Sequence, residues 1–236
     1  MDINIITLFP GMFEGVFQES IIARAVAKDL ARIRIVHLRD FGLGPHRVVD
    51  DMPFGGGGGM ILKPEPIAAA LQTVEPRGRV ILTTPRGMPF TQDHALRLSR
   101  EPVITVLCGH YEGVDERVSQ LFVDEELSIG DYVLTGGELP AMVMTDAIVR
   151  LIPGVLGRDS LHTGDSHYHG LLEHPQYTRP RVYMGLSVPE VLLSGNHEDI
   201  RRWREMTAKE KTRAVRPDLL EEPRPVSGND HQEGGG

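Results

Sequence analysis

The sequence predicts an α/β protein with a mostly parallel sheet. Its first part alternates short runs of β-branched residues with segments of helical periodicity. Strands that alternate with helices of this length form βαβ units, in which the strands pair in parallel. With 236 residues, of which 40% are hydrophobic and 25% charged, the chain can bury a proper core as one large domain or as a main domain with a small partner.

The expected elements follow one another in a regular order. Each expected strand is a short aliphatic run, and each expected helix is a longer stretch with a helical pattern. We expect strands at residues 3–8, 33–38, 80–84 and 103–108, and helices at 12–30, 64–74, 91–99, 115–121 and 140–152. Asp115 is expected to cap the helix that follows it. Ligands of such sheets bind at the carboxyl ends of the strands, where the loops 83–87, 109–113 and 128–141 would lie.

The composition changes after the helix at 140–152. Pro153 and Gly154 end this helix, and the Gly-, His-, Ser- and Asp-rich stretch that follows reads as an interdomain linker. Beyond it we expect helices without strands, with capping boxes at 187–190 and 207–210. The predicted division is a main domain at 1–157, a linker at 158–170, a helical domain at 171–223 and a disordered tail at 224–236.

Charge and cysteine content restrict the class of protein. A formal net charge of −8 argues against indiscriminate binding to nucleic acid, although residues 196–217 carry seven Arg or Lys against four acids. The single cysteine, Cys108, excludes an intramolecular disulfide and suits a reducing cytosol. The N-terminus has no signal-peptide pattern, and the longest apolar region, 133–156, carries three charges. We therefore expect a cytoplasmic protein without a membrane span.

The loop at 128–141 is the strongest candidate for a ligand site. It is a β-like run broken by glycines that passes through Pro140 into an apolar helix. The glycine pair Gly136-Gly137 lets the backbone come close to a bound molecule. No Lys or Arg lies between Arg117 and Arg150, whereas a phosphate cradle would require such a cation. The pattern predicts a nucleoside-like ligand that is neutral or positive and is held by main-chain groups.

Three other features remain ambiguous from the residues alone. The five glycines at 55–59 form either a flexible surface loop or a loop that passes close to a substrate. Asp146 and Arg150 form either an i,i+4 pair on one helix face or a site in which the arginine reaches a substrate oxygen. The histidines between 162 and 174 have no closed zinc spacing, so we expect no metal site there.

Several long motifs occur in an order typical of one known family. They lie at 108–117, 130–140, 153–157, 177–180, 193–197 and 201–204. The chain thereby resembles the bacterial tRNA (guanine-N1)-methyltransferase family (TrmD family, SPOUT class), which modifies tRNA position 37 beside the anticodon. The resemblance runs from the first strand to about residue 220.

This resemblance implies a fold, a methyl donor and an assembly that hydrophobic periodicity does not predict. It implies a trefoil-knotted main domain that binds S-adenosylmethionine as methyl donor, a helical domain that binds the tRNA anticodon arm, and an obligate homodimer with active sites between subunits. It also implies catalytic roles, with Asp165 as general base for the proton on guanine N1 and Arg150 stabilising charge on O6. A base on the linker would become organised when tRNA bridges the two domains.

The resemblance also assigns binding residues. Arg201, Arg202 and Arg204 would contact tRNA phosphates, and Trp203 would pack inside its domain. The positions that match the donor site are Leu82, Thr83, Thr84, Pro85, Gly109, Glu112, Ile129, Gly130, Asp131, Tyr132, Val133, Leu134, Gly136, Gly137 and Pro140.

Two departures and two alternative functions accompany the resemblance. His110 stands where some relatives carry Arg, and the glycine run replaces the Pro or Ala that many relatives have within that loop. One alternative is a knotted methyltransferase that modifies another RNA atom, such as a ribose hydroxyl. The other is a non-catalytic RNA-binding protein with a vestigial donor pocket. Mapping the modified nucleotide and measuring donor binding would separate them.

Overall fold

The chain forms two compact units. The computed structural model describes residues 1–156, 166–167 and 170–220, and divides into Met1–Ser160 and Leu161–Gly236. This division falls inside the predicted linker. Asp165 and the predicted tail lie outside the described residues.

A five-stranded sheet forms the centre of the first unit and confirms the predicted α/β class. Its strands lie in the order β2-β1-β6-β5-β7, and every neighbouring pair is parallel. The strands are β1 (Asp2–Thr7), β2 (Arg32–His37), β5 (Arg79–Pro89), β6 (Val103–Cys108) and β7 (Glu125–Ser128). The predicted strand at 103–108 is confirmed with its bounds.

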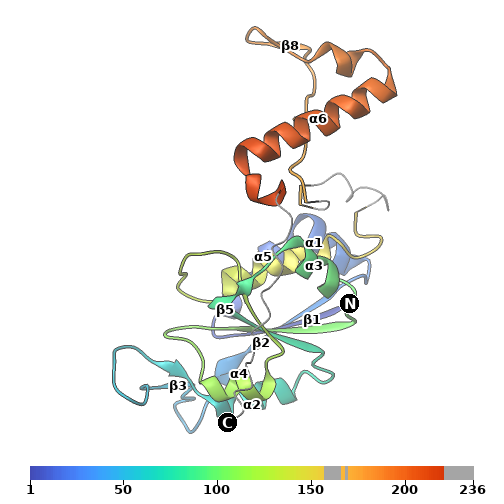
Figure 1. Cartoon of the computed structure of the whole chain (residues 1–236). Helices are drawn as coiled ribbons and strands as arrows, with labels where there is room; N and C mark the ends of the chain where they lie inside the picture. The colour runs from blue at the N-terminus through green and yellow to red at the C-terminus, as the bar shows by residue number, and fades with distance from the viewer. Residues whose placement is uncertain (157–165, 168–169, 221–236) are drawn as a thin grey trace, which may run out of the picture. The chain divides into compact units, whose positions relative to one another are not determined.

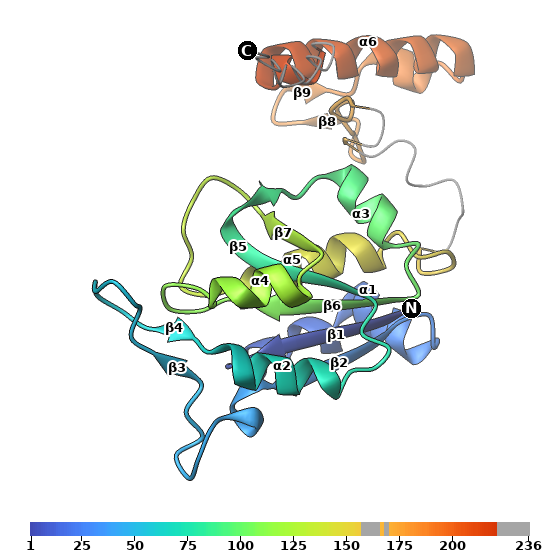
Figure 2. The ribbon, with the colours of Figure 1, turned by 60° about the horizontal axis from the view of Figure 1, so that its bottom comes forward.

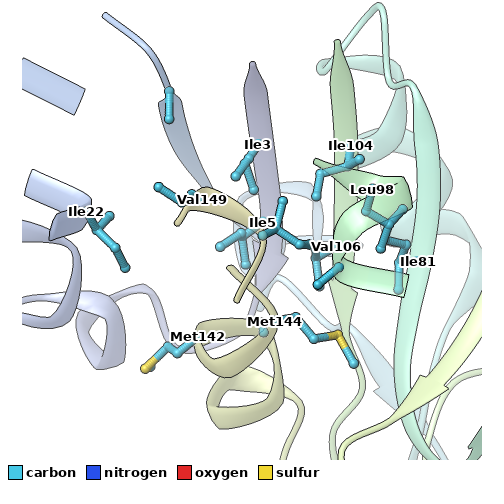
Figure 3. Packing of buried hydrophobic residues seen from close by; sticks show 14 of the residues in the cluster. Ile3, Ile5, Ile22, Ile81, Leu98, Ile104, Val106, Met142, Met144 and Val149 are labelled. Atoms are coloured by element: carbon cyan, nitrogen blue, oxygen red, sulfur yellow. The ribbon is translucent and has the colours of Figure 1, made fainter. Parts of the chain in front are cut away.

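Helices cover both faces of this sheet (Figures 1 and 2). One face carries α1 (Ser20–Ala27), α3 (Gln92–Leu98) and α5 (Glu138–Val149), and the other carries α2 (Pro64–Gln72) and α4 (Glu116–Phe122). Figure 3 shows how the first layer packs: Ile3 and Ile5 of β1 meet Met144 and Val149 of α5. Each such fully buried aliphatic side chain contributes about 1.5–3 kcal/mol relative to an exposed one.

Three expectations for the first unit were incomplete or wrong. The stretch 12–30 is not one helix, because Gly15 adopts φ +91° and Ser20 φ +55°, which end helical geometry. It forms the 3₁₀ turns η1 (Pro10–Phe13) and η2 (Val16–Gln18) before α1. Strand β5 runs five residues beyond its expected end, with a register shift between Thr83 and Met88. Strand β7 was not expected.

A short hairpin and one further 3₁₀ turn complete this unit. After η3 (Leu38–Phe41), strands β3 (Asp50–Asp51) and β4 (Ile61–Leu62) pair antiparallel. The five glycines lie in the loop between them, and four of the five have positive φ. The expectation that they form no regular structure is confirmed.

The second unit contains one long helix and a small hairpin. Its elements are β8 (Val182–Tyr183), β9 (Leu186–Ser187), the 3₁₀ turn η5 (Glu190–Leu193), α6 (His197–Val215) and the 3₁₀ turn η6 (Pro217–Leu220). The expectation of helices without strands is therefore wrong at β8 and β9. Within the described residues, no helix of either unit combines the length and apolar character needed to cross a membrane.

Both predicted capping boxes of the second unit are also wrong. Asn196 caps α6, since its side-chain oxygen accepts from the N–H groups of Glu198 and Asp199. Thr207 lies inside α6, where its hydroxyl donates to the Trp203 carbonyl at 2.9 Å. Pro189 precedes η5 without a side-chain cap. The pattern at 207–210 falls inside α6, and the pattern at 187–190 is followed by η5 without a side-chain cap.

Candidate active site

A cavity of about 280 Å³ opens beside the middle of β5 and the carboxyl ends of β6 and β7. The three segments predicted to meet at this edge all line it, although 83–87 is an irregular part of β5 and not a separate loop. All positions that the resemblance marks for the donor line the cavity except Asp131. The further lining residues are Arg86, His110, Tyr111, Gly113, Val114, Leu127, Ser128 and Thr135.

Two glycines allow the segments around the cavity to approach. A Cβ on Gly137 would lie 2.0 Å from Thr83 Oγ1 and 2.8 Å from the Gly109 nitrogen. The Gly137 N–H donates to the Gly109 carbonyl at 2.7 Å. A Cβ on Gly136 would lie 2.5 Å from His110 Nδ1, and these two residues form an antiparallel bridge. The glycine pair therefore serves close packing between loops, in addition to any approach to a ligand.

A buried carboxylate lies beneath this glycine pair. Glu138, at the start of α5, is 1% exposed, and its Oε1 accepts from Thr7 Oγ1 at 2.7 Å. Its Oε2 lies 4.0 Å from His110 Nδ1. Together with burial, this carboxylate raises the pKa of the Cys108 thiol well above its usual value, burial being the larger cause. The sequence gives no local sign of this contact, because Thr7 on β1 lies 131 positions away.

His110 is held between aromatic rings at the wall of the cavity. Its ring centroid lies 4.8 Å from that of Phe9 and 4.6 Å from that of Tyr111. Its Nδ1 is buried and has no hydrogen-bond partner among the described residues. His110 thus packs between aromatic rings next to a buried carboxylate.

The cavity contains one arginine that the loop-based charge argument had not considered. Arg86 donates to Glu116 Oε2 at 2.8 Å and to Glu126 Oε1 at 3.1 Å. Donation to these two carboxylates raises the pKa of Arg86 above its ordinary value. Since two acids neutralise this single cation, the lining still offers little to a phosphate.

Glu112 connects the cavity to the glycine loop at 55–59. Its side chain is exposed and lines the cavity. A Cβ on Gly59 would lie 2.4 Å from Glu112 Cγ, and the Glu112 N–H donates to the Met60 carbonyl at 3.0 Å. At least the last glycine of the run is therefore packed against a residue of the site.

Comparison with known proteins shows the family of this chain. A sequence model of the family described as tRNA (Guanine-1)-methyltransferase TrmD matches residues 1–222. The chain belongs to this family. Proteins named tRNA (guanine-N(1)-)-methyltransferase from Geobacter sulfurreducens and Staphylococcus epidermidis are 56% and 55% identical to it, over 93% and 94% of this chain and 91% of each relative. The protein from Geotalea uraniireducens is 54% identical over 93% of this chain and 90% of its own.

Membership makes this chain a tRNA-modifying methyltransferase and fits its parallel-sheet fold. Of the two residues expected to be catalytic, the structure describes Arg150. It forms the C-cap of α5, with its N–H donating to the Asp146 carbonyl at 3.2 Å, and its side chain is partly buried. The catalytic roles of Arg150 and Asp165 remain predictions.

The arginines that the resemblance assigns to tRNA lie on the exposed surface of α6. Arg201 pairs with Glu205 at 2.7 Å, and Arg202 pairs with Glu198. Trp203 packs within its unit as expected, with its ring centroid 6.2 Å from that of His174 and 6.3 Å from that of Tyr177. Their contact with tRNA stays a prediction.

Proposed function

We propose that this enzyme transfers a methyl group from S-adenosylmethionine to N1 of guanosine 37 in tRNA. The observation that carries the proposal is the cavity beside the middle of β5 and the carboxyl ends of β6 and β7, in a chain that belongs to the tRNA (guanine-1)-methyltransferase family. Position 37 and the identity of the donor come from the resemblance. The chemistry of the lining supports the donor.

The lining fits a cationic, phosphate-free donor. S-adenosylmethionine carries a sulfonium and an adenine but no phosphate, and it supplies the methyl group. The lining combines five glycines with apolar side chains such as Leu82 and Ile129, Glu112 adds an exposed carboxylate, and Arg86 is neutralised by two glutamates. We propose that residues 82–85, Gly109, Glu112 and the loop 129–140 hold the donor.

The guanine must lose a proton before it can attack. N1 carries a proton at neutral pH, which Asp165 would accept; N1 would then form its bond to the methyl carbon as the carbon–sulfur bond breaks. Negative charge collects on O6 as the proton leaves, and Arg150 would stabilise it electrostatically. Holding methyl carbon and N1 in line supplies the rest of the rate enhancement.

The remaining proposals concern assembly and location. We propose that the main domain is a trefoil knot spanning residues 1–157, and that the chain acts in the cytoplasm as a homodimer with active sites between subunits. The helical domain at 171–223 would hold the anticodon arm through α6, where Arg201, Arg202 and Arg204 are exposed. Sedimentation of the intact chain measures the dimer directly.

Labelled donor with unmodified tRNA transcripts tests the proposal. Transcripts that differ only at positions 36 and 37 should take up label only where a guanosine at 37 follows a guanosine at 36, and the label should map to N1. Label on a ribose hydroxyl would support the alternative function, a methyltransferase that modifies another RNA atom. Absence of donor binding in calorimetry would contradict any methyltransferase activity.

The catalytic assignment has a separate test. Asp165→Asn should lower the single-turnover methylation rate about 100- to 10,000-fold, the usual contribution of a general base, and leave donor affinity unchanged. Asp93→Asn, an exposed position in the first turn of α3, is the matched control. If Asp165→Asn kept its full rate, another group would have to be the base.

A further inference from the structure

The β8–β9 hairpin exposes four large apolar side chains to solvent. It projects from the rest of the second unit (Figure 1). Tyr183 is 67% exposed, Met184 86%, Leu186 79% and Val182 57%. Four neighbouring apolar side chains left in water at one tip are typical of a surface that binds something.

The strand register places two of these side chains on one face. Tyr183 pairs directly with Leu186, and the Val188 N–H donates to the Arg181 carbonyl at 2.9 Å, which extends the ladder by one position. Directly opposed residues share a face, and so do residues two apart in a strand. Arg181, Tyr183 and Leu186 therefore share one face, with the ring beside the guanidinium-bearing residue.

The turn of this hairpin adopts an unusual conformation. Met184 has φ +50° and Gly185 φ +85°. Two-residue turns of this kind favour Asn-Gly, and a bulky residue such as Met is uncommon in the left-handed region. Such strain tends to occur at functional positions. Here it holds Met184 at the outermost point of the hairpin.

The charge around the hairpin is positive without compensation. Residues 174–189 contain Arg179 and Arg181 and no Asp or Glu, in a chain of net charge −8. Both arginines are exposed, and within the described residues neither has a carboxylate partner. On α6, by contrast, Arg201 and Arg202 are each paired with a glutamate of the same helix.

The segment that leads into the hairpin is anchored to the long helix. His174 and Tyr177 pack against Trp203 of α6, with ring centroids 6.2 and 6.3 Å away. The segment before the hairpin therefore packs on the same helix that carries the arginines expected to contact tRNA.

We propose that the β8–β9 hairpin binds an unpaired nucleotide of the tRNA substrate, with Tyr183 stacking on its base and Arg181 contacting an adjacent phosphate. The inference rests on the proposed function and adds a contact to it. An aromatic ring beside an arginine without a carboxylate partner is typical of sites that bind single-stranded nucleic acid. The ring stacks on a base, and the guanidinium contacts a backbone phosphate. A loop nucleotide offers such an exposed base, whereas a base inside a stem does not.

Equilibrium binding of an unmodified tRNA transcript to the full-length chain tests this contact. Tyr183→Ala should weaken binding about 5- to 100-fold, the usual range for losing one stacked base, while Tyr183→Phe should stay within about twofold. Arg181→Ala should reduce the slope of log affinity against log salt by about one. Leu121→Ala, an apolar position on α4 of the first unit that is 67% exposed, is the matched control and should bind like wild type.

The outcomes of these experiments separate failure of the hairpin proposal from failure of the proposed function. If wild type methylates tRNA and Tyr183→Ala binds it equally well, the hairpin proposal is overturned and the proposed function stands. If Tyr183→Ala changes the sedimentation of the free protein, the surface is a contact with a second copy of the chain, which also overturns the proposal. If wild type neither binds nor methylates tRNA, the proposed function fails as well. A selective rise in KM for tRNA with unchanged kcat supports the contact.

Discussion

Replacing Gly137 by alanine should disrupt the floor of the cavity. Gly137 has φ −83° and ψ −2°, a conformation that alanine adopts freely, so any cost is steric. Its Cβ would lie 2.0 Å from Thr83 Oγ1, 2.8 Å from the Gly109 nitrogen and 2.9 Å from the Cys108 Cα. Two of these three atoms belong to backbone and cannot rotate away.

The magnitude follows from two contributions. Forcing an extra methyl into a well-packed site costs about 1–3 kcal/mol. The Gly137 N–H bond to the Gly109 carbonyl would also be strained or lost, at about 1 kcal/mol. We expect the free energy of unfolding to fall by about 2–4 kcal/mol. With a slope of about 2 kcal/mol/M in urea, the midpoint should fall by about 1–2 M.

Far-ultraviolet circular dichroism in urea is the suitable assay, because the single tryptophan, Trp203, lies in the other unit. Gly58→Ala is the matched control, since its Cβ would have nothing within 4 Å and its φ is not left-handed. It should change stability by no more than about 1 kcal/mol. Calorimetry with S-adenosylmethionine should show weaker binding for Gly137→Ala only.

A second variant sharpens the test. Adding Thr83→Ala to Gly137→Ala removes the nearest clash but leaves the two backbone contacts, so it should restore part of the lost stability and not all of it. If Gly137→Ala had the unfolding midpoint and donor affinity of the Gly58→Ala control, the close approach of these loops would be refuted.

Three further predictions concern groups elsewhere in the first unit. Thr7→Val should lower the free energy of unfolding by about 1.5–3 kcal/mol in urea titration, because Glu138 loses its hydrogen-bond donor, and Thr7→Ser should not. Asp115→Ala should cost about 1 kcal/mol at pH 7 through loss of the α4 cap. Hydrogen bonding from Arg117 lowers the pKa of Asp115 in the folded protein, so the stabilisation from the Asp115 carboxylate is present above about pH 4. It is lost as the pH falls through the lowered pKa of the folded protein. The free energies of unfolding of wild type and Asp115→Ala should become equal there. The Cys108 thiol, buried and with a raised pKa, should react with a thiol reagent only after unfolding.

The repeating local patterns of the first unit could be predicted from sequence. The strand at 103–108 is a continuous aliphatic run between turn residues, and Asp115 is an N-cap followed by an acidic first turn, so each signal lies within a few residues. That the segments 83–87, 109–113 and 128–141 line one cavity followed from the rule that parallel strands present their carboxyl ends at one edge, although 83–87 is part of β5 and not a loop. Where local signals competed, as at 12–30 and 207–210, sequence analysis misplaced the helix boundaries.

The sequence by itself determined the α/β class, the family and the segments that surround the cavity, because these depend on periodicity and on motifs that are contiguous in the chain. Only the tertiary structure decided that Gly137 packs against Thr83, that Glu138 is buried under a hydroxyl of β1, and that Arg86 is neutralised by two glutamates. Those contacts join residues 30 to 131 positions apart. Their energies depend on distance and burial in three dimensions, which no local pattern records.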